Sequence, residues 1–208
     1  MKIKLHESKV PLTRGHDLLL ILGDGRSMPE DMKTFLSWQI PHDVGAIGRC
    51  IKAYPGKVHH WFNADGDSAI HWAKNLINGE GTVRHTLGEM DGFDADWDIE
   101  QDDYHHADMT NEKLIVRSHG SSSLFATLAG LEMGYQKVIL GGCPMDAEGH
   151  WYFDQDPKVP ETYGPLWMGY DFMAWLDFAK QPEAARVRSL SGYTAQIIGE
   201  VTRQWLTN

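Results

Sequence analysis

The sequence is poor in cysteine, in long apolar runs and in positive charge, and each shortage excludes a class of protein. Two cysteines among 208 residues cannot build a disulfide framework, so a reducing cytoplasm is the expected location. The longest aliphatic run, Leu18–Leu22, is far shorter than the ~20 residues that cross a bilayer, and the N-terminus lacks a secretory apolar core. With 19 basic against 29 acidic residues and no basic cluster, duplex nucleic acid is not an expected partner.

What the chain does contain is an alternation of short apolar runs and amphipathic stretches. Short apolar runs bounded by Gly, Pro or charged residues are typical of strands buried in a parallel sheet, and the stretches between them begin with capping residues. The pattern predicts one Rossmann-like α/β domain over residues 1–208, with a mostly parallel sheet and helices on both faces. The expected strands are Asp17–Gly23, Asp43–Ile47, Val58–Phe62, Thr82–Thr86, Lys113–Arg117, Lys137–Leu140 and Val187–Leu190. The expected helices include one that follows Ile47 and runs through Tyr54, Ser121–Met133 and, last, Tyr193–Leu206.

Two long segments interrupt the alternation. Residues 87–112 are acidic and weakly periodic, and we expect an irregular surface segment there. Residues 144–165 are rich in Gly, Pro, Asp and aromatic residues. Because long loops without regular structure are often functional, 144–165 is a candidate lid over a binding site, the alternative being a packed surface loop.

The most polar, glycine-rich loops follow the expected strands, where ligands bind in open α/β sheets. The stretch "LGDGRS", Leu22–Ser27, joins a strand to a helix, so that its amides and the helix N-terminus favour an anion, and Asp24 suits a ribose hydroxyl. A tight turn without ligand contact is the alternative. The stretch "SHGSSS", Ser118–Ser123, offers four hydroxyls and His119 before a second helix, although capping needs only one hydroxyl.

The stretch "NADGD" suggests a metal-dependent function, in which Asp65 and Asp67 could hold a divalent cation that bridges a diphosphate. Asp67 as a simple helix cap is the competing interpretation. The eleven histidines show none of the usual zinc-ligand spacings, so no zinc site is expected. In the candidate lid, His150 and Tyr152 are side chains that transfer protons without a metal.

Three motifs, in order along the chain, resemble the bacterial family 42 sialyltransferases and the related domain-of-unknown-function 115 proteins, which include 6-hydroxymethylpterin pyrophosphokinases and phage-borne relatives. The motifs are "ILGDGRSM" (Ile21–Met28), "GAIGR" (Gly45–Arg49) and "GSSSLFATLAGLEMGYQKVILGGCPMD" (Gly120–Asp146). The resemblance implies a Rossmann-like domain that binds a nucleotide beyond the strand ends. It also implies that Tyr152 supports the nucleotide phosphate. By this resemblance the residues that face the nucleotide are Gly23, Asp24, Gly25, Ser27, Gly120 and Ser121. Gly48, Ser122 and Gly142 complete the candidate nucleotide-binding residues.

We therefore expect a nucleotide-binding transferase that uses a nucleotide-activated sugar and no metal, with a small-molecule or glycan acceptor. His150 or His119 is the candidate general base. One alternative is a Mg²⁺-dependent pyrophosphokinase that uses Asp65 and Asp67. The other is a non-catalytic nucleotide-binding accessory protein of phage type, because Asp24 and Gly48 stand where the family has Asn. The sequence leaves homo-oligomerisation open.

Overall fold

The computed structural model describes residues 2–64, 80–100, 121–146 and 165–207. Eight strands form one sheet in the order β1-β6-β5-β4-β3-β2-β7-β8. All neighbours are parallel except β1 and β6, which pair antiparallel. The strands are β1 (Lys2–Ser8), β2 (Leu18–Leu22), β3 (Asp43–Ile47), β4 (His60–Asn63), β5 (Val83–Leu87), β6 (Ala95–Glu100), β7 (Lys137–Gly141) and β8 (Val187–Ser189).

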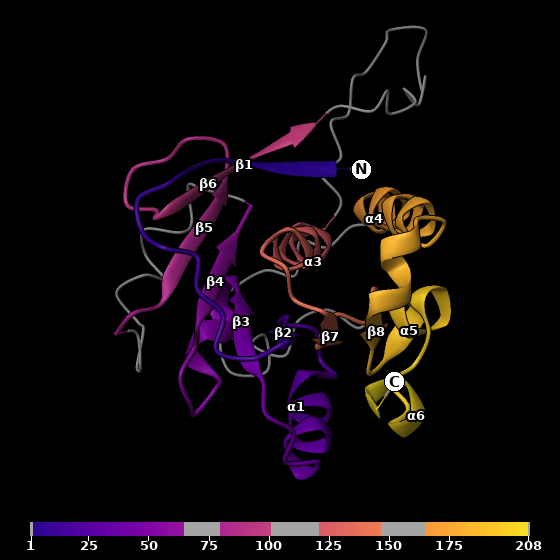
Figure 1. Ribbon diagram of the computed structural model, residues 1–208. Helices are drawn as coiled ribbons and strands as arrows, with labels where there is room; N and C mark the ends of the chain where they lie inside the picture. The colour runs from indigo at the N-terminus through magenta and orange to yellow at the C-terminus, as the bar shows by residue number, and fades with distance from the viewer. Residues whose placement is uncertain (1, 65–79, 101–120, 147–164, 208) are drawn as a thin grey trace, which may run out of the picture.

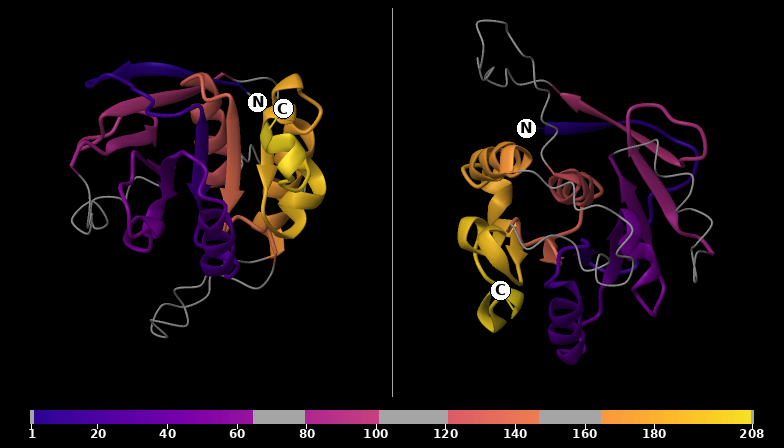
Figure 2. Two further views of the ribbon diagram at one scale, coloured as in Figure 1. Left: turned by 60° about the horizontal axis from the view of Figure 1, so that its bottom comes forward. Right: turned by 180° about the vertical axis from the view of Figure 1, so that it is seen from behind.

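Helices cover both faces of this sheet, which confirms the predicted fold class (Figure 1). α3 packs on one face and α1 on the other, while α4, α5 and α6 gather beside β8 (Figure 2). The helices are α1 (Met28–Ser37), α3 (Ser122–Glu132), α4 (Pro165–Phe178), α5 (Gly192–Ile198) and α6 (Arg203–Thr207), with 3₁₀ turns η1 (Gly48–Lys52) and η3 (Pro182–Arg186).

The centre of the sheet follows from the apolar run of β2. Leu19 and Ile21 point into the core on the α3 side, whereas Leu20 and Leu22 point into the core on the α1 side. Every residue of β2 is buried, because both of its faces are covered by helices. The sheet also curls, so that β1 at its edge packs on α3 (Figure 1).

The prediction of an irregular segment over 87–112 is wrong for its first part, which contains β6. Ala95 and Trp97 are buried and alternate with Asp96 and Asp98, and the strand pairs with β5 on one side and β1 on the other. The acidic residues conceal the period-2 pattern. β1 itself, with the alternating sequence "KIKLHES", was not predicted. Residues 101–112 lie outside the described ranges, as does the strand expected at Lys113–Arg117.

Two helices also differ from expectation. The single last helix expected over Tyr193–Leu206 is divided into α5 and α6, because Gly199 has a φ of +95° and ends α5. The helix expected after β3 is the 3₁₀ turn η1, which begins at Gly48 with a φ of +49°. The expected helix Ser121–Met133 is confirmed as α3, with Gly134 at a φ of +91° after its end.

Candidate functional site

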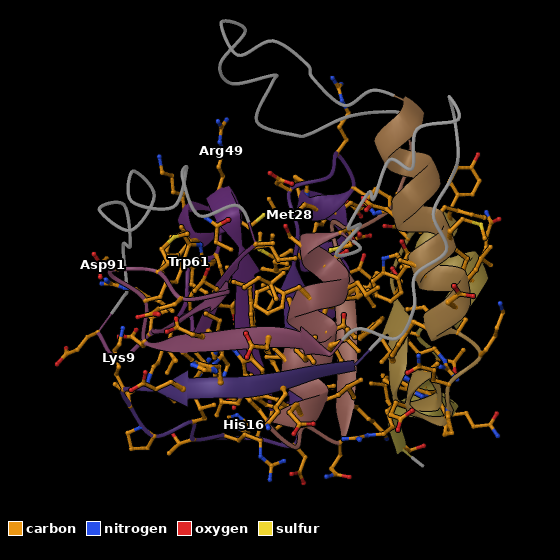
Figure 3. The ribbon with its side chains drawn as sticks, turned by 90° about the horizontal axis from the view of Figure 1, so that it is seen from above. Lys9, His16, Met28, Arg49, Trp61 and Asp91 are labelled. Atoms are coloured by element: carbon orange, nitrogen blue, oxygen red, sulfur yellow. The ribbon has the colours of Figure 1, made fainter. Side chains whose placement is uncertain are left out.

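The described parts of the loops singled out by the sequence lie at the carboxyl edge of the sheet. Met28 and Arg49 follow β2 and β3 at this edge, and His16 lies at the opposite edge (Figure 3). Eight described residues of the predicted nucleotide site are at this edge, from four segments of the chain: Gly23, Asp24, Gly25, Ser27, Gly48, Ser121, Ser122 and Gly142. Gly120, His119, His150, Tyr152, Asp65 and Asp67 lie outside the described ranges, as do most residues of the candidate lid 144–165.

The β2–α1 turn is packed directly against the loop after β7. The Gly23 N–H donates to the Gly141 carbonyl at 2.8 Å, and the Gly25 N–H donates to the Gly142 carbonyl at 2.8 Å. A Cβ on Gly142 would lie 2.3 Å from the Gly23 oxygen, and a Cβ on Gly23 would lie 2.5 Å from the Cys143 sulfur. These glycines therefore allow two loops to touch, and in this arrangement the Gly23 and Gly25 amides are not available to a phosphate.

A buried carboxylate joins the same loops. Asp31, in the first turn of α1 and only 7% exposed, accepts the Gly142 N–H at 2.8 Å. The same oxygen, Oδ2, lies 2.9 Å from the Ser27 hydroxyl and 2.6 Å from the Ser191 hydroxyl, and these two hydroxyls are 2.8 Å apart. The connections after β2, β7 and β8 thus converge on one oxygen. The Ser27 hydroxyl, a predicted nucleotide ligand, already has partners within the protein.

The N-terminus of α3 is a capped helix end beside a buried thiol. Ser121 is the N-cap residue, and its oxygen accepts the Leu124 N–H at 3.4 Å and the Trp175 indole N–H at 3.1 Å. Ser123 hydrogen-bonds to the thiol of Cys143. Burial raises the pKa of Cys143, and the charges of Asp24 and Asp31 raise it further, so this cysteine is a neutral thiol rather than a nucleophilic thiolate.

Gly48 differs from Gly23, Gly25 and Gly142 because the space where a Cβ would stand is empty of described atoms. It has a φ of +49°, and no described heavy atom lies within 4 Å of the place where a Cβ would stand. Its carbonyl accepts the Trp61 indole N–H at 2.8 Å, which fixes the turn. A ligand could approach the backbone closely here.

Asn63 is a candidate that the sequence reasoning missed. It ends β4 directly beside Gly48, since Ile47 and Phe62 are register partners, and it is only 5% exposed. A buried amide at the carboxyl end of a central strand carries both hydrogen-bond donors and an acceptor. Its signal in the sequence was the polar residue that ends the apolar run "WF".

The described part of the chain contains no group of three His, Cys, Asp or Glu side chains arranged to hold a metal ion. None of its helices is both long and apolar enough to cross a membrane.

Of the comparisons with known proteins, the one with solved structures supports the fold. No family model matches the chain, and no curated protein matches it. Among solved structures, the chain is similar to a mutant of the alpha-2,3/8-sialyltransferase CstII, with a TM-score of 0.53 and 13% identity. The match covers 89% of this chain and 87% of that chain. The neighbour is a sialyltransferase, the class of enzyme that the sequence motifs resemble, and at this identity the similarity establishes a shared fold.

Proposed function

We propose that this protein binds a nucleotide-activated sugar at the carboxyl edge of its sheet and transfers the sugar to a small-molecule or glycan acceptor. The observation that carries this proposal is the position of Asp24, Gly48 and Ser121–Ser122 at one sheet edge. Ligands bind at this edge in open α/β sheets, and the fold resembles that of a sialyltransferase.

The nucleoside part of the ligand fits best against the ends of β2, β3 and β4. Gly48 leaves space for close approach to the backbone, and the neighbouring Asn63 amide can both donate and accept hydrogen bonds. The Asp24 carboxylate is an acceptor for ribose hydroxyls. Together these groups suit a nucleoside better than they suit a phosphate.

The phosphate fits better at the N-terminus of α3 than at that of α1. Asp31 already occupies the first turn of α1 with an internal negative charge, and Glu30 adds a second. The first turn of α3 has no acidic residue, and Ser121 and Ser122 bring hydroxyls to it. A helix N-terminus attracts anions, but the carboxylates already at the N-terminus of α1 would repel a phosphate. We therefore assign the phosphate to the N-terminus of α3.

Catalysis is assigned to side chains beyond the described ranges, as the sequence indicates. His150 or His119 serves as the base that accepts the proton of the acceptor hydroxyl, and Tyr152 supports the leaving phosphate. The mechanism requires no metal. Removing a positioned general base lowers the rate by about 10²–10⁴-fold. Replacement His150→Ala is therefore expected to abolish sugar transfer while nucleotide affinity is kept.

The test is a thermal-denaturation panel with CMP, UDP, GDP and ATP at millimolar concentration, with and without Mg²⁺. A ligand at 100 times its Kd stabilises the folded state by about 2.7 kcal/mol, so a true ligand raises the Tm clearly. Gly48→Ala should remove this shift. Gly88→Ala is the matched control, because Gly88 also has a positive φ, +75°, and open space around its Cβ position, but follows β5.

Each other outcome assigns a different function. Stabilisation that requires Mg²⁺ would favour the pyrophosphokinase-type enzyme with Asp65 and Asp67. If none of the four nucleotides raises the Tm, the nucleotide site is refuted and a non-catalytic accessory role is favoured. A shift that Gly48→Ala leaves unchanged would show that the ligand lies elsewhere.

A further inference from the structure

A continuous chain of hydrogen bonds crosses the interior at a distance from the candidate site. The Trp97 indole lies 3.1 Å from Nδ1 of His85, whose Nε2 lies 3.0 Å from Nδ1 of His60. Nε2 of His60 is 2.8 Å from the Tyr135 hydroxyl, which donates to Oδ2 of Asp43 at 2.8 Å. All five side chains are at most 1% exposed. They come from β3, β4, β5, β6 and the connection between α3 and β7.

Only one arrangement of protons satisfies this chain. An indole N–H can only donate, so Nδ1 of His85 must accept, and the ring proton of His85 is on Nε2. That proton is donated to Nδ1 of His60, so His60 also carries its proton on Nε2. His60 then donates to Tyr135, and Tyr135 donates to the carboxylate. Both histidines are therefore neutral Nε2–H tautomers.

A proton added to either histidine breaks a bond in the chain. Protonated His85 would present an N–H to the N–H of Trp97, and protonated His60 would present an N–H to the N–H of His85. Neither histidine has a second acceptor among the described residues.

Phe62 stacks on His85 at 4.6 Å between ring centres, and Phe125 of α3 packs against Phe62.

The charges around the chain lie at its Asp43 end. This carboxylate also accepts the backbone N–H groups of Gly15 and His16, and its Oδ1 lies 2.8 Å from Nδ1 of His16 and 3.5 Å from Nε2 of His59. The guanidinium of Arg14 lies over the Tyr135 ring at 5.8 Å.

No carboxylate reaches the His85 end among the described residues. Burial lowers the pKa of His85 well below its ordinary value, and burial together with the charge of His59 lowers the pKa of His60 to about 4. The pKa of His59 is also lowered, by burial first and by Lys57, His16 and His42, while Asp43 opposes this.

We propose that the Trp97–His85–His60–Tyr135–Asp43 chain is a pH-sensitive latch. At neutral pH it ties strands β4, β5 and β6 to β3 and to the α3–β7 connection. When His60 or His85 takes up a proton, the latch opens, and this side of the sheet loosens before the central strands β2 and β7 do. The contacts that remain between β3, β4, β5 and β6 are short, with three or four register pairs at each strand pair.

The first test is the tautomer state, measured by two-bond ¹H–¹⁵N correlation spectroscopy on the ¹⁵N-histidine-labelled protein at pH 7.5. The expected result is an Nε2–H tautomer for both His60 and His85. An Nδ1–H tautomer at either residue overturns the proposal, and this measurement needs no variant.

The second test is amide hydrogen exchange at pH 7.5 and pH 4.5, corrected for the intrinsic exchange rate. Protection in β5 and β6 should fall by about tenfold or more relative to β2 and β7. His85→Phe keeps an aromatic ring and removes one of the two titrating histidines, so it should reduce this difference. His6→Gln changes an exposed histidine that pairs with Asp98 and serves as the control. Equal loss of protection in all strands, or an unchanged difference in His85→Phe, overturns the latch.

Discussion

Replacement of Asp31 should destabilise the protein strongly, because this one carboxylate holds three connections together. Asp31→Ala removes the acceptor of the Gly142 N–H and the partner of two hydroxyls, Ser27 and Ser191. A hydrogen bond to a charged group contributes about 1.5–3 kcal/mol, and a buried N–H left without a partner costs about 1–3 kcal/mol. These contributions overlap, and we expect the free energy of unfolding to fall by about 3–5 kcal/mol.

Two further variants separate charge from packing at this position. Asp31→Asn keeps one oxygen for the Gly142 N–H but loses the charge, so its expected cost is about 1–2 kcal/mol. Glu30→Ala is the control on the same turn, since Glu30 is 75% exposed and pairs with the exposed Lys33 at 3.7 Å. Its effect should stay within about 0.5 kcal/mol.

Urea denaturation at pH 7, followed by circular dichroism, measures these differences if the urea dependence is unchanged among the variants. A double-mutant cycle between Asp31→Asn and Ser191→Ala should give a coupling of about 0.5–1 kcal/mol or more, because the two side chains are in direct contact. If Asp31→Ala lies within about 1 kcal/mol of Glu30→Ala, the three hydrogen bonds do not hold the loops together and the reasoning fails.

Three other predictions concern glycine geometry, acid stability and the C-terminal helix. Gly142→Ala should lower the free energy of unfolding by more than about 3 kcal/mol in urea denaturation, because this residue has a φ of +66° and its Cβ would lie 2.3 Å from a backbone oxygen. Gly92→Ala is the control: Gly92 has a φ of +87° but open space around its Cβ position, so the expected cost is about 1 kcal/mol. Burial raises the pKa of Asp43, but hydrogen bonds from His16, Tyr135 and two backbone amides outweigh it and lower the pKa to about 2, from 3.8. The ionised carboxylate therefore stabilises the fold above about pH 4, and about 2.5 kcal/mol should be lost progressively as the pH falls from about 5 to about 1, a loss absent in Asp43→Asn. Trp205→Leu should lower the free energy of unfolding by about 1 kcal/mol, because the indole ring lies 5.4 Å from the Lys137 ammonium and 5.3 Å from the Arg188 guanidinium. Thermal denaturation measures this loss, and an unchanged Tm would show that these cation–π contacts contribute nothing.

The central strands and α3 could be predicted because their signals are local. Leu18–Leu22 is apolar at every position, which only a strand covered on both faces requires. Ser121 and Gly134 mark the two ends of α3 through a capping hydroxyl and a left-handed backbone. Both signals depend on residues within a few positions of each other, so no knowledge of the rest of the chain was needed.

Strands β1 and β6 could not be predicted because their stability comes from partners distant in sequence. β6 is stabilised as a strand by pairing with β5 and β1 and by burial of Trp97, although Asp96 and Asp98 lower its intrinsic tendency to form a strand. The same reason conceals the buried histidine chain. His60 and His85 carry no spacing that distinguishes them from surface histidines, and only the sheet register brings them together with Tyr135.

The glycine motif after β2 shows how the same residues can suggest two different roles. Gly23 and Gly25 fit a phosphate-binding turn, yet their amides donate to the carbonyls of Gly141 and Gly142. Asp31 then occupies the adjoining helix N-terminus as an internal anion. A second anion at the same helix end would meet its repulsion, so the glycines of this turn serve loop packing. Within the described edge, the space beside Gly48 and the first turn of α3, which has no acidic residue, are the places to which the proposed function assigns the nucleoside and the phosphate.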